Sequence, residues 1–433
     1  MKKAYYIETF GCQMNVHDSE KIAGILKKDG YTEADNPQDA DIIVFNTCSI
    51  RAKAEQKFFS KLGRLKTLKK RNPLLKIAVA GCIAQQAGAK ILQRAPYIDY
   101  VIGPQNLHLL TQISTLRKYS VARDDNPVLA ETDFCVDRKD RIKAWVTIMY
   151  GCNNFCSYCV VPYTRGREKS RPSGKIVDEI KELAGEGFKE ITLLGQNVNS
   201  YRSDLDFMGL LYKINEIQGI ERIRFVTSHP KDLSNDLIHA MRDLDKVCEH
   251  IHLPLQSGST RILKLMNRNY GYEDYLRQID LLRKTIPSIS ITTDIIAGFP
   301  QESEEDHSLT MRALKDIGFD GIFAFNYSPR PGTKASEFTG HIDEDVSSRR
   351  LYEILDLQTA ITDQKNKELE DTIQEVLIEE EVVNTKGRVF TGRTRSNKIV
   401  NVTLIGQVGT GDTVNVRIIK TNRHSMEAVV LST

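Results

Sequence analysis

The alternation of apolar and polar residues divides the chain into three blocks. In the first block, to about residue 120, short apolar runs of strand length alternate with stretches whose apolar residues recur at helical spacing. The predicted strands are KAYYIETF (3–10), DIIVFNT (41–47), KIAVAG (76–81) and IDYVIG (98–103). Such a strand–helix succession predicts a parallel, doubly wound sheet as an N-terminal α/β domain over residues 1–120.

The second block repeats the strand–helix pattern six more times. Residues 121–140 have no clear period and are predicted to be a linker. Residues 141–366 then contain the predicted strands KAWVTIMYG, EITLLGQ, RIRFVTS, HIHLPLQ, SITTDIIAGF and GIFAFNYS. A right-handed succession of this kind curls toward a barrel, but six units fall short of eight. We therefore expect a partial (βα)6 barrel with its functional groups at the carboxyl ends of the strands.

The last block, residues 367–433, changes to β-branched segments separated by Gly and Asn, which predicts a small closed all-β barrel. It is also basic. From Asn384 onward eight Lys and Arg face two acidic residues, a surplus of six, whereas the whole chain carries only +3. Clustered basic residues gain affinity for polyanions by releasing counterions, which indicates an RNA partner. The candidate RNA contacts in this block are Arg388, Arg393, Arg395 and Lys398.

Composition narrows the class of protein. With 27% charged and 40% hydrophobic residues, the chain is typical of a globular protein and contains no segment that approaches a membrane span. The N-terminal stretch lacks the apolar core of a signal peptide, so we expect a cytoplasmic protein without a membrane partner. Eight cysteines in 433 residues are too few for a disulfide scaffold. In a reducing compartment, clustered cysteines indicate metal binding or catalysis.

Three of these cysteines, Cys152, Cys156 and Cys159, lie in one loop with the spacing C-x3-C-x2-C. A structural zinc site normally has four protein ligands, often as two separated pairs, and no second pair is near, although Cys135 in the linker could supply a fourth. An iron–sulfur cubane held by only three thiolates keeps one iron open for a substrate or cofactor. The spacing therefore favours a cofactor-binding cluster over zinc.

Three other cysteines, Cys12, Cys48 and Cys82, each follow a predicted strand of the first block. Their intervals of 36 and 34 residues match one strand–helix unit. Neighbouring carboxyl ends of a parallel sheet meet at one crevice, where such folds bind ligands. The sequence thus predicts a second trio of thiols in one place.

The cysteine loop, GCNNFCSYC at 151–159, resembles the cluster loop of radical S-adenosylmethionine (SAM) enzymes, including the aromatic Tyr158 before the last cysteine. A cysteine trio ahead of that barrel and a basic β-barrel behind it resemble the methylthiotransferases. The segments GCNNFCSYCVVPYTRGREKSR, LPLQSGSTRILKLMNRNY, DIIAGFPQESEEDH and NYSPRPGTKA are similar to the bacterial MiaB type, which acts on tRNA. The resemblance covers essentially the whole chain, and its last block would be the TRAM domain.

The resemblance implies two 4Fe-4S clusters. Cys152, Cys156 and Cys159 would hold the one that binds SAM and splits it to a 5′-deoxyadenosyl radical. Cys12, Cys48 and Cys82 would hold an auxiliary cluster carrying the sulfur. A first SAM would methylate that sulfur, and a second would yield the radical that attacks C2 of N6-isopentenyladenosine beside the tRNA anticodon. The implied partners are the tRNA anticodon stem-loop, an electron donor such as flavodoxin or ferredoxin, and a sulfur or cluster carrier protein.

Further candidates lie at strand ends. The candidate cofactor-binding residues are Tyr158, Gln196, Asn197, Ser228, Gln256, Ser257 and Asp294. Ordinary turns and helix caps would also explain Gln196, Asn197 and Ser257. Arg165 and Arg167 follow the cluster loop and could approach tRNA phosphate or a SAM carboxylate. His250 and His252 alternate on one strand, and without a third ligand nearby we interpret them as hydrogen-bonding residues.

The motifs leave two alternatives open. Related methylthiotransferases modify threonylcarbamoyladenosine in tRNA or an aspartate of a ribosomal protein, and the cysteine trios do not discriminate these substrates. A non-catalytic RNA-binding iron–sulfur protein is the alternative from another class. Release of 5′-deoxyadenosine from SAM would identify an enzyme, because a protein that only binds RNA does not cleave SAM.

Overall fold

The computed structural model describes residues 3–49, 52–112, 120–384, 387–403 and 408–431. They form two compact units, which are described separately. The first unit comprises residues 1–139, 150–153 and 159–171, and the second comprises residues 140–149, 154–158 and 172–433. None of the helices in the described ranges is long and apolar enough to span a bilayer. The domain boundaries at residues 120, 140 and 366 stay predictions.

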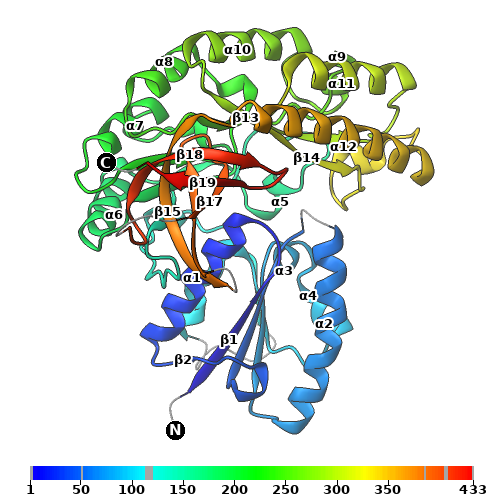
Figure 1. The fold of residues 1–433 in the computed structure, drawn as a ribbon. Coiled ribbons are helices and arrows are strands. Elements are labelled where there is room, and N and C mark those ends of the chain that lie inside the picture. Colours follow the sequence, from blue (N-terminus) through cyan, green and yellow to red (C-terminus); the bar gives the residue numbers. More distant parts are fainter. Residues whose placement is uncertain (1–2, 50–51, 113–119, 385–386, 404–407, 432–433) are drawn as a thin grey trace. The chain divides into compact units, whose positions relative to one another are not determined.

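The first unit is built on a six-stranded parallel sheet with the order β2-β1-β3-β4-β5-β6 (Figure 1). Its strands are β1 (Ala4–Thr9), β2 (Thr32–Glu33), β3 (Ile42–Thr47), β4 (Lys76–Gly81), β5 (Tyr100–Ile102) and β6 (Ser120–Ala122). The four predicted strands are confirmed. The edge strands β2 and β6 were not predicted, because two or three residues are too short to show a period.

Helices cover both faces of this sheet, which confirms the doubly wound arrangement. One face packs α1 (Gln13–Lys28) and the 3-10 helix η2 (Pro104–Gln112), and the other packs α2 (Ala52–Arg71), α3 (Cys82–Ala87) and α4 (Ala89–Arg94). The shorter 3-10 helices η1 (Pro37–Asp39) and η3 (Leu129–Glu131) lie in connections. Because both faces are covered, all six residues of β3 are buried.

The second unit contains the open half-barrel. Its six parallel strands are β7 (Lys143–Thr147), β10 (Glu190–Leu194), β11 (Arg222–Phe225), β12 (His250–His252), β13 (Ser290–Ala297) and β14 (Gly321–Asn326). They form the sheets β11-β10-β7 and β12-β13-β14, which a parallel bridge between Ile223 and Val247 connects. Among the described residues β7 and β14 pair on one side only. The predicted six-unit partial barrel is therefore confirmed.

Helices cover the outer face of the half-barrel (Figure 1). They are α6 (Ser173–Gly185), α7 (Phe207–Asn215), α8 (Asn235–Asp243), α9 (Thr260–Leu265), α10 (Tyr272–Thr285), α11 (Glu304–Ile317) and α12 (Glu344–Lys367). The remaining short elements are α5 (Val161–Thr164), β8 (Met149–Tyr150), β9 (Lys169–Ser170), η4 (Val198–Ser200), η5 (Pro230–Asp232) and η6 (Lys334–Glu337).

The strands of the half-barrel alternate between two kinds of side chain. Residues such as Ile191, Ile223 and Ile295 pack against the helices in the largest core. Because successive side chains point to opposite faces of a strand, their neighbours Arg224 and Asp294 point to the inner face. The inner face of the half-barrel therefore carries polar side chains.

The last five strands close into a small barrel with the order β15-β16-β17-β19-β18. They are β15 (Ile373–Asn384), β16 (Gly387–Thr394), β17 (Ile399–Thr403), β18 (Thr413–Thr421) and β19 (Met426–Val430). They fall within residues 367–433, whose β-branched segments predicted an all-β block. The closed barrel confirms the fold expected of the last block and fits a TRAM-like domain.

Two buried arginines of β11 fasten this barrel to the half-barrel within the second unit. Arg224 donates to the carbonyl oxygens of Thr394 and Arg395, both at 2.8 Å, and its Nε donates to Glu190 at 2.9 Å. Arg222 donates to the carbonyl oxygen of Arg393 at 2.7 Å. These are charge-assisted bonds between buried groups, so the two parts of the unit are coupled rather than loosely tethered.

Candidate functional site

The thiols of the first unit lie at the carboxyl ends of β1, β3 and β4, next to the point where the order of the strands reverses. Cys12 follows β1 as the N-cap of α1, Cys48 follows β3, and Cys82 is the first residue of α3 after β4. β2 lies on the other side of β1 from β3, so Cys12 and Cys48 flank the topological switch point. Gly11 has a φ of +122°, and a Cβ there would lie 2.2 Å from the Cβ of Cys48. The two cysteine loops are therefore in direct contact.

A buried asparagine pair fixes these two loops against each other. Asn15 donates to the Asn46 side-chain oxygen at 3.1 Å and to the Thr47 carbonyl oxygen at 2.9 Å. Asn46 donates to the Asn15 carbonyl oxygen at 2.7 Å. Buried amides that are fully paired in this way hold one geometry. Sequence reasoning missed this pair, although an asparagine at the end of the apolar run IIVF was a visible signal.

The positive charge near the thiols of Cys12 and Cys82 comes from Arg165. This side chain is 6% exposed, donates to Asp18 at 2.8 Å, and hydrogen-bonds the thiol of Cys82. A hydrogen bond from Cys48 lowers the pKa of Cys12 to about 6 against the effect of burial, and Arg165 and Asn15 act in the same direction. Burial raises the pKa of Cys82. Arg165, predicted as an RNA contact, thus faces the thiols, whereas Arg167 is exposed.

In metal-free protein we expect Cys12 to react with iodoacetamide with a midpoint near pH 6, because the thiolate is the reactive form and its pKa is lowered to about 6. The thiolate is thus present at pH 7 and is lost as the pH falls through 6. Peptide mass spectrometry of the alkylated protein across pH 5–9 measures the midpoint of the Cys12 reaction. Cys48→Ala removes the main hydrogen bond and should move the midpoint to higher pH. An unchanged midpoint in that variant contradicts this assignment.

The loop trio spans both units, with Cys152 and Cys159 in the first and Cys156 in the second. In the second unit, the backbone on either side of Cys156 is bound to the end of α9. Ser157 donates from its backbone to the Met266 carbonyl oxygen at 3.0 Å, and Asn267 donates to the Phe155 carbonyl oxygen at 3.0 Å. Cys156 is therefore held by defined backbone contacts.

A second buried arginine lies beside Cys156. Nη1 of Arg268 is 3.5 Å from the sulfur of Cys156 and 3.4 Å from the hydroxyl of Tyr158. Its other nitrogens donate to the Tyr270 hydroxyl at 2.8 Å and the Pro254 carbonyl oxygen at 2.7 Å. Although burial opposes the charge, Tyr270, Tyr158 and Cys156 hold the pKa of Arg268 well above its usual range. The family resemblance used the segment that contains Arg268, but the sequence did not predict that this arginine lies beside Cys156.

Among the described residues, no group of three or more His, Cys, Asp or Glu side chains forms a preformed metal site. What both trios have is a guanidinium beside a thiol. A guanidinium beside a sulfur compensates the negative charge that a thiolate ligand carries when it binds iron. The donor chemistry therefore fits an iron–sulfur cluster at each trio.

Four buried polar atoms that follow the strands β10, β11 and β12 have no hydrogen-bond partner within the described part of the chain. They are Oδ1 of Asn197, Oγ of Ser228, Nε2 of His229 and Oε1 of Gln256. Leaving such a group unsatisfied costs about 1–3 kcal/mol, so a cluster of them indicates a polar ligand. Asn197, Ser228 and Gln256 had been predicted as cofactor contacts, a role that stays a prediction. His229 was missed.

The tautomer of His229 follows from its contacts. Burial lowers its pKa to about 2, so the ring is neutral. Nδ1 accepts a hydrogen bond from the backbone of Lys231 at 3.3 Å. The proton therefore lies on Nε2, the nitrogen without a partner in the described residues, which makes His229 a donor toward the ligand.

The remaining predicted residues are placed differently. Ser257 is buried and accepts from the backbone of Ser259 at 3.2 Å, as a helix-capping loop would. Asp294 lies on the inner face, 3.5 Å from Nε2 of His252. His252 also contacts Thr292 at 3.0 Å, a local hydrogen bond of the predicted kind. Gln196 lies directly after β10.

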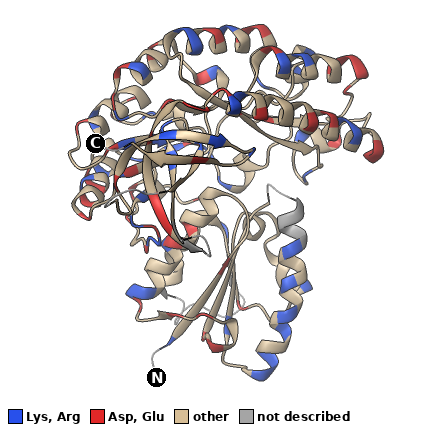
Figure 2. Ribbon diagram, in the orientation of Figure 1, with Lys and Arg blue, Asp and Glu red and all other residues tan. Residues whose placement is uncertain are grey.

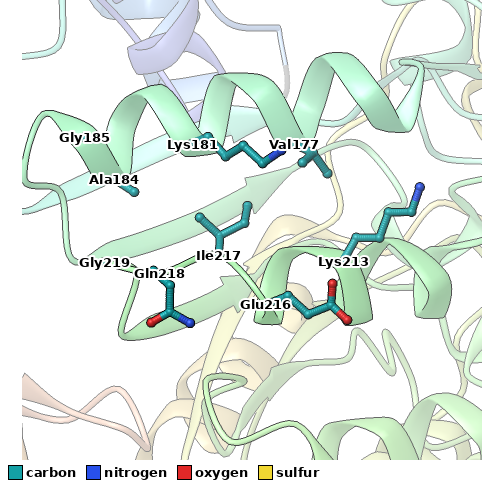
Figure 3. A pocket seen from close by; sticks show the side chains of 9 residues that line it. All are labelled: Val177, Lys181, Ala184, Gly185, Lys213, Glu216, Ile217, Gln218 and Gly219. Carbon is teal, nitrogen blue, oxygen red and sulfur yellow. The ribbon is translucent and has the colours of Figure 1, made fainter.

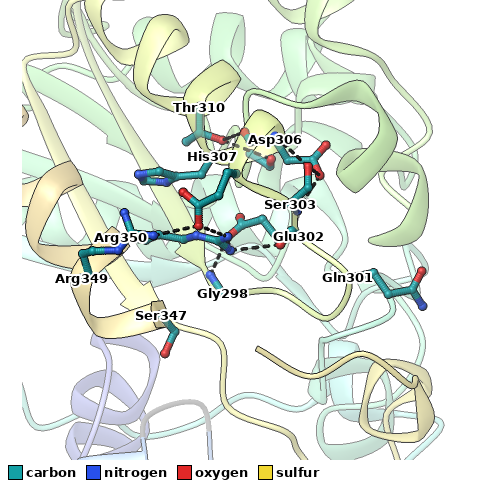
Figure 4. Close-up of polar contacts among 12 residues, drawn as sticks. Gly298, Gln301, Glu302, Ser303, Asp306, His307, Thr310, Ser347, Arg349 and Arg350 are labelled. Atoms are coloured by element: carbon teal, nitrogen blue, oxygen red, sulfur yellow. Dashed lines mark hydrogen bonds and ion pairs between the residues drawn. The ribbon is translucent and has the colours of Figure 1, made fainter. Parts of the chain in front are cut away.

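A charged network fixes the loop that follows β13 (Figure 4). Glu302 accepts from the backbone of Gly298 at 2.9 Å and from Arg350 of α12 at 2.8 Å. Burial raises the pKa of Glu302. Ser303 and Asp306 form a capping box at the start of α11. These contacts connect the loop, α11 and α12 and contribute to structure rather than to ligand binding.

A groove on the outer surface lies between α6 and α7 (Figure 3). Val177, Ala184 and Ile217 line it together with the side chains of Lys181 and Lys213. It also includes Gly185 and Gly219, which lie shortly before β10 and β11 begin. The groove is therefore at the amino ends of these strands, opposite to the candidate site.

The half-barrel, its cysteine loop and the unpaired polar atoms at its carboxyl ends define a radical SAM enzyme. The profile of the Radical SAM superfamily matches residues 146–314, and that of "Uncharacterized protein family UPF0004" matches residues 4–103. The chain belongs to the family of tRNA-2-methylthio-N(6)-dimethylallyladenosine synthases, which are radical SAM methylthiotransferases. This confirms the resemblance inferred from the two cysteine trios.

The relatives match over their full length. The synthase of Thermodesulfovibrio yellowstonii is 57% identical, with 100% of this chain and 99% of the relative covered. That of Thermoanaerobacter sp. is 49% identical, with 98% and 92% covered. An enzyme of this class uses an iron–sulfur cluster and SAM.

Solved structures share the fold alone. The radical SAM methyltransferase TsrM of Kitasatospora setae, with cobalamin and a [4Fe-4S] cluster bound, has a TM-score of 0.58 at 15% identity, covering 78% of this chain and 77% of that one. The cobalamin-dependent radical SAM enzyme OxsB has a TM-score of 0.52 at 12% identity, covering 78% and 55%.

Proposed function

We propose that this enzyme methylthiolates C2 of N6-dimethylallyladenosine, also called N6-isopentenyladenosine, beside the anticodon of tRNA. One SAM would donate the methyl group and a second would act as radical source. The observation that carries this proposal is the full-length match, at 57% identity, to a relative named for that product. Threonylcarbamoyladenosine and a ribosomal-protein aspartate remain the alternative substrates, and no relative cited above is named for either.

Two 4Fe-4S clusters are part of this proposal. Cys152, Cys156 and Cys159 would hold one, and Cys12, Cys48 and Cys82 the other. SAM bound at the first cluster supplies a 5′-deoxyadenosyl radical. The chain's own contribution is electrostatic and geometric: Arg268 compensates negative charge at Cys156, and Arg165 does so at Cys82.

The unpaired polar atoms would bind and orient the nucleoside or amino-acid part of SAM. His229 donates from Nε2, whereas Asn197 and Gln256 accept through their side-chain oxygens. Positioning of this kind is the main task of a protein that leaves the difficult chemistry to its cofactor. An electron donor such as flavodoxin or ferredoxin and a sulfur or cluster carrier protein complete the proposal.

The proposed RNA surface differs from the one expected from charge counting. Arg395 pairs with Glu249 at 2.7 Å, and Lys398 donates to Asn366 at 3.0 Å, so both contact protein groups. Arg393 lies 3.4 Å from Glu379, and the side chain of Arg388 lies outside the described residues. Further candidate RNA contacts are exposed basic residues of α2 and, in the other unit, of β18 (Figure 2). They are Lys57, Arg64, Lys66, Lys70, Arg71, Arg417 and Lys420.

The test is reconstitution under anaerobic conditions with iron, sulfide, SAM, a reductant and tRNA that carries dimethylallyladenosine. Mass spectrometry of the nucleosides should show the 2-methylthio product together with 5′-deoxyadenosine. Parallel reactions with threonylcarbamoyladenosine tRNA test the alternative substrate. A protein that releases no 5′-deoxyadenosine would be the non-catalytic RNA binder instead.

A further inference from the structure

The edge strand β14 of the half-barrel exposes two phenylalanines on one face. Phe323 is 53% exposed and Phe325 is 42% exposed, and they are the exposed phenylalanines among the described residues. Their neighbours Ile322 and Ala324 pack against the helix-covered core. Because side chains alternate along a strand, Phe323 and Phe325 point to the opposite, inner face.

Polar groups of the inner face adjoin this aromatic pair. Phe323 is the register partner of Asp294, and Phe325 is the partner of Ile296. The ring of His252 meets that of Phe323 edge-on, with centroids 5.8 Å apart. Nε2 of His252 is in turn 3.5 Å from Asp294. The open edge of the half-barrel thus carries an apolar wall next to groups that can hydrogen-bond.

Such a wall needs an explanation beyond folding. Exposed aromatic side chains that adjoin one another are uncommon on a soluble protein and mark a binding surface. Phe323 and Phe325 take no part in the core contacts of their own strand, which Ile322 and Ala324 provide. Phe323 is in line with Asp294 on the inner face, and it also lines a groove with residues of α12 and of the C-terminal barrel, among them Leu355 and Lys398.

We infer that Phe323 and Phe325 bind the adenine ring and dimethylallyl group of the substrate nucleoside. This inference rests on the proposed function. An unstacked base is bound by stacking on aromatic side chains, and the five-carbon alkyl group adds apolar surface that a phenyl ring can cover. Asp294 and His252 then lie where they can contact the polar edge of the base. A neutral, flat and partly apolar ligand matches this wall better than a phosphate backbone does.

The experiment compares Phe323→Ala, Phe325→Ala and the double variant with wild type, in reconstituted full-length enzyme. Loss of a stacking contact should lower kcat/KM for dimethylallyladenosine tRNA by about tenfold or more, mainly through KM. SAM cleavage without RNA should stay at the wild-type rate. Anisotropy of a labelled anticodon stem-loop measures binding directly, with the same RNA lacking the dimethylallyl group as reference.

Tyr212→Ala is the matched control, because Tyr212 is an exposed aromatic residue on the outer helix α7. Phe323→Tyr should restore most of the binding, since it keeps the ring. If the alanine variants match Tyr212→Ala in KM and in RNA binding, the inference is wrong. If wild type itself forms no methylthio product, the proposed function fails first, and stem-loop binding still reports on the two phenylalanines.

Discussion

Cys156→Ala is expected to abolish release of 5′-deoxyadenosine from SAM, whereas Cys48→Ala should stop methylthiolation and leave part of the SAM cleavage uncoupled. The two cysteines belong to different trios with separate proposed tasks, radical generation and sulfur supply. Cys156 is fixed by backbone contacts to α9 and lies beside Arg268, while Cys48 lies against Gly11 and Cys12 at the switch point of the N-terminal sheet. Chromatography of reaction mixtures measures both products.

The iron content of each variant reports on the two clusters independently of the reaction products. Each variant should retain iron for one cubane, and wild type for two. Cys135→Ala is the matched control, because Cys135 belongs to neither trio, and it should keep both products. The division of tasks is refuted if Cys156→Ala and Cys48→Ala lose SAM cleavage to the same extent.

Arg224→Met should destabilise the second unit by about 3–5 kcal/mol, since it leaves the carboxylate of Glu190 buried without its partner. The Arg224 and Glu190 side chains are 6% and 3% exposed, so water cannot replace the lost contact. The same substitution also removes the two donors to the carbonyl oxygens of Thr394 and Arg395. Urea unfolding, followed by the fluorescence of Trp145 on β7, measures the change.

Two further variants show how much of the lost stability comes from the unpaired buried charge of Glu190. Arg224→Met combined with Glu190→Gln removes the stranded charge and should recover part of the stability. Arg242→Met is the matched control, because Arg242 pairs with Asp243 on the exposed surface, where ion pairs contribute little. Equal stability of Arg224→Met and Arg242→Met would show that the buried pair does not stabilise the unit.

The sequence predicted the architecture well because the elements are strongly periodic. The fully apolar run of β3 and the β-branched strands of the last block leave few alternatives. The spacing of the cysteines was equally informative, since a thiol after each of three successive strands has one common location in a parallel sheet.

It was harder to predict from the sequence which individual side chains are buried and which are exposed to solvent. The segment RIRF of β11 resembles a half-exposed strand with arginines in solvent, but Arg222 and Arg224 are buried because a second barrel covers them. Arg165 looked like an RNA contact, and Arg268 looked like one basic residue among several. Their partners, Asp18 and Cys156, are more than 100 residues away in the chain, and no local pattern contains that information.

The two β11 arginines have a consequence for protein engineering. A chimera that receives the C-terminal module of a relative also receives new groups opposite Arg222 and Arg224, and a mismatch there would leave both guanidinium groups buried without their carbonyl partners. Deleting the module outright would instead expose both arginines and the surface around them to water and remove their carbonyl partners. A shortened enzyme that loses tRNA modification would therefore report an altered catalytic half as readily as the loss of RNA binding. Point substitutions at Arg417 and Lys420 avoid this ambiguity, because both side chains lie on the solvent side of β18.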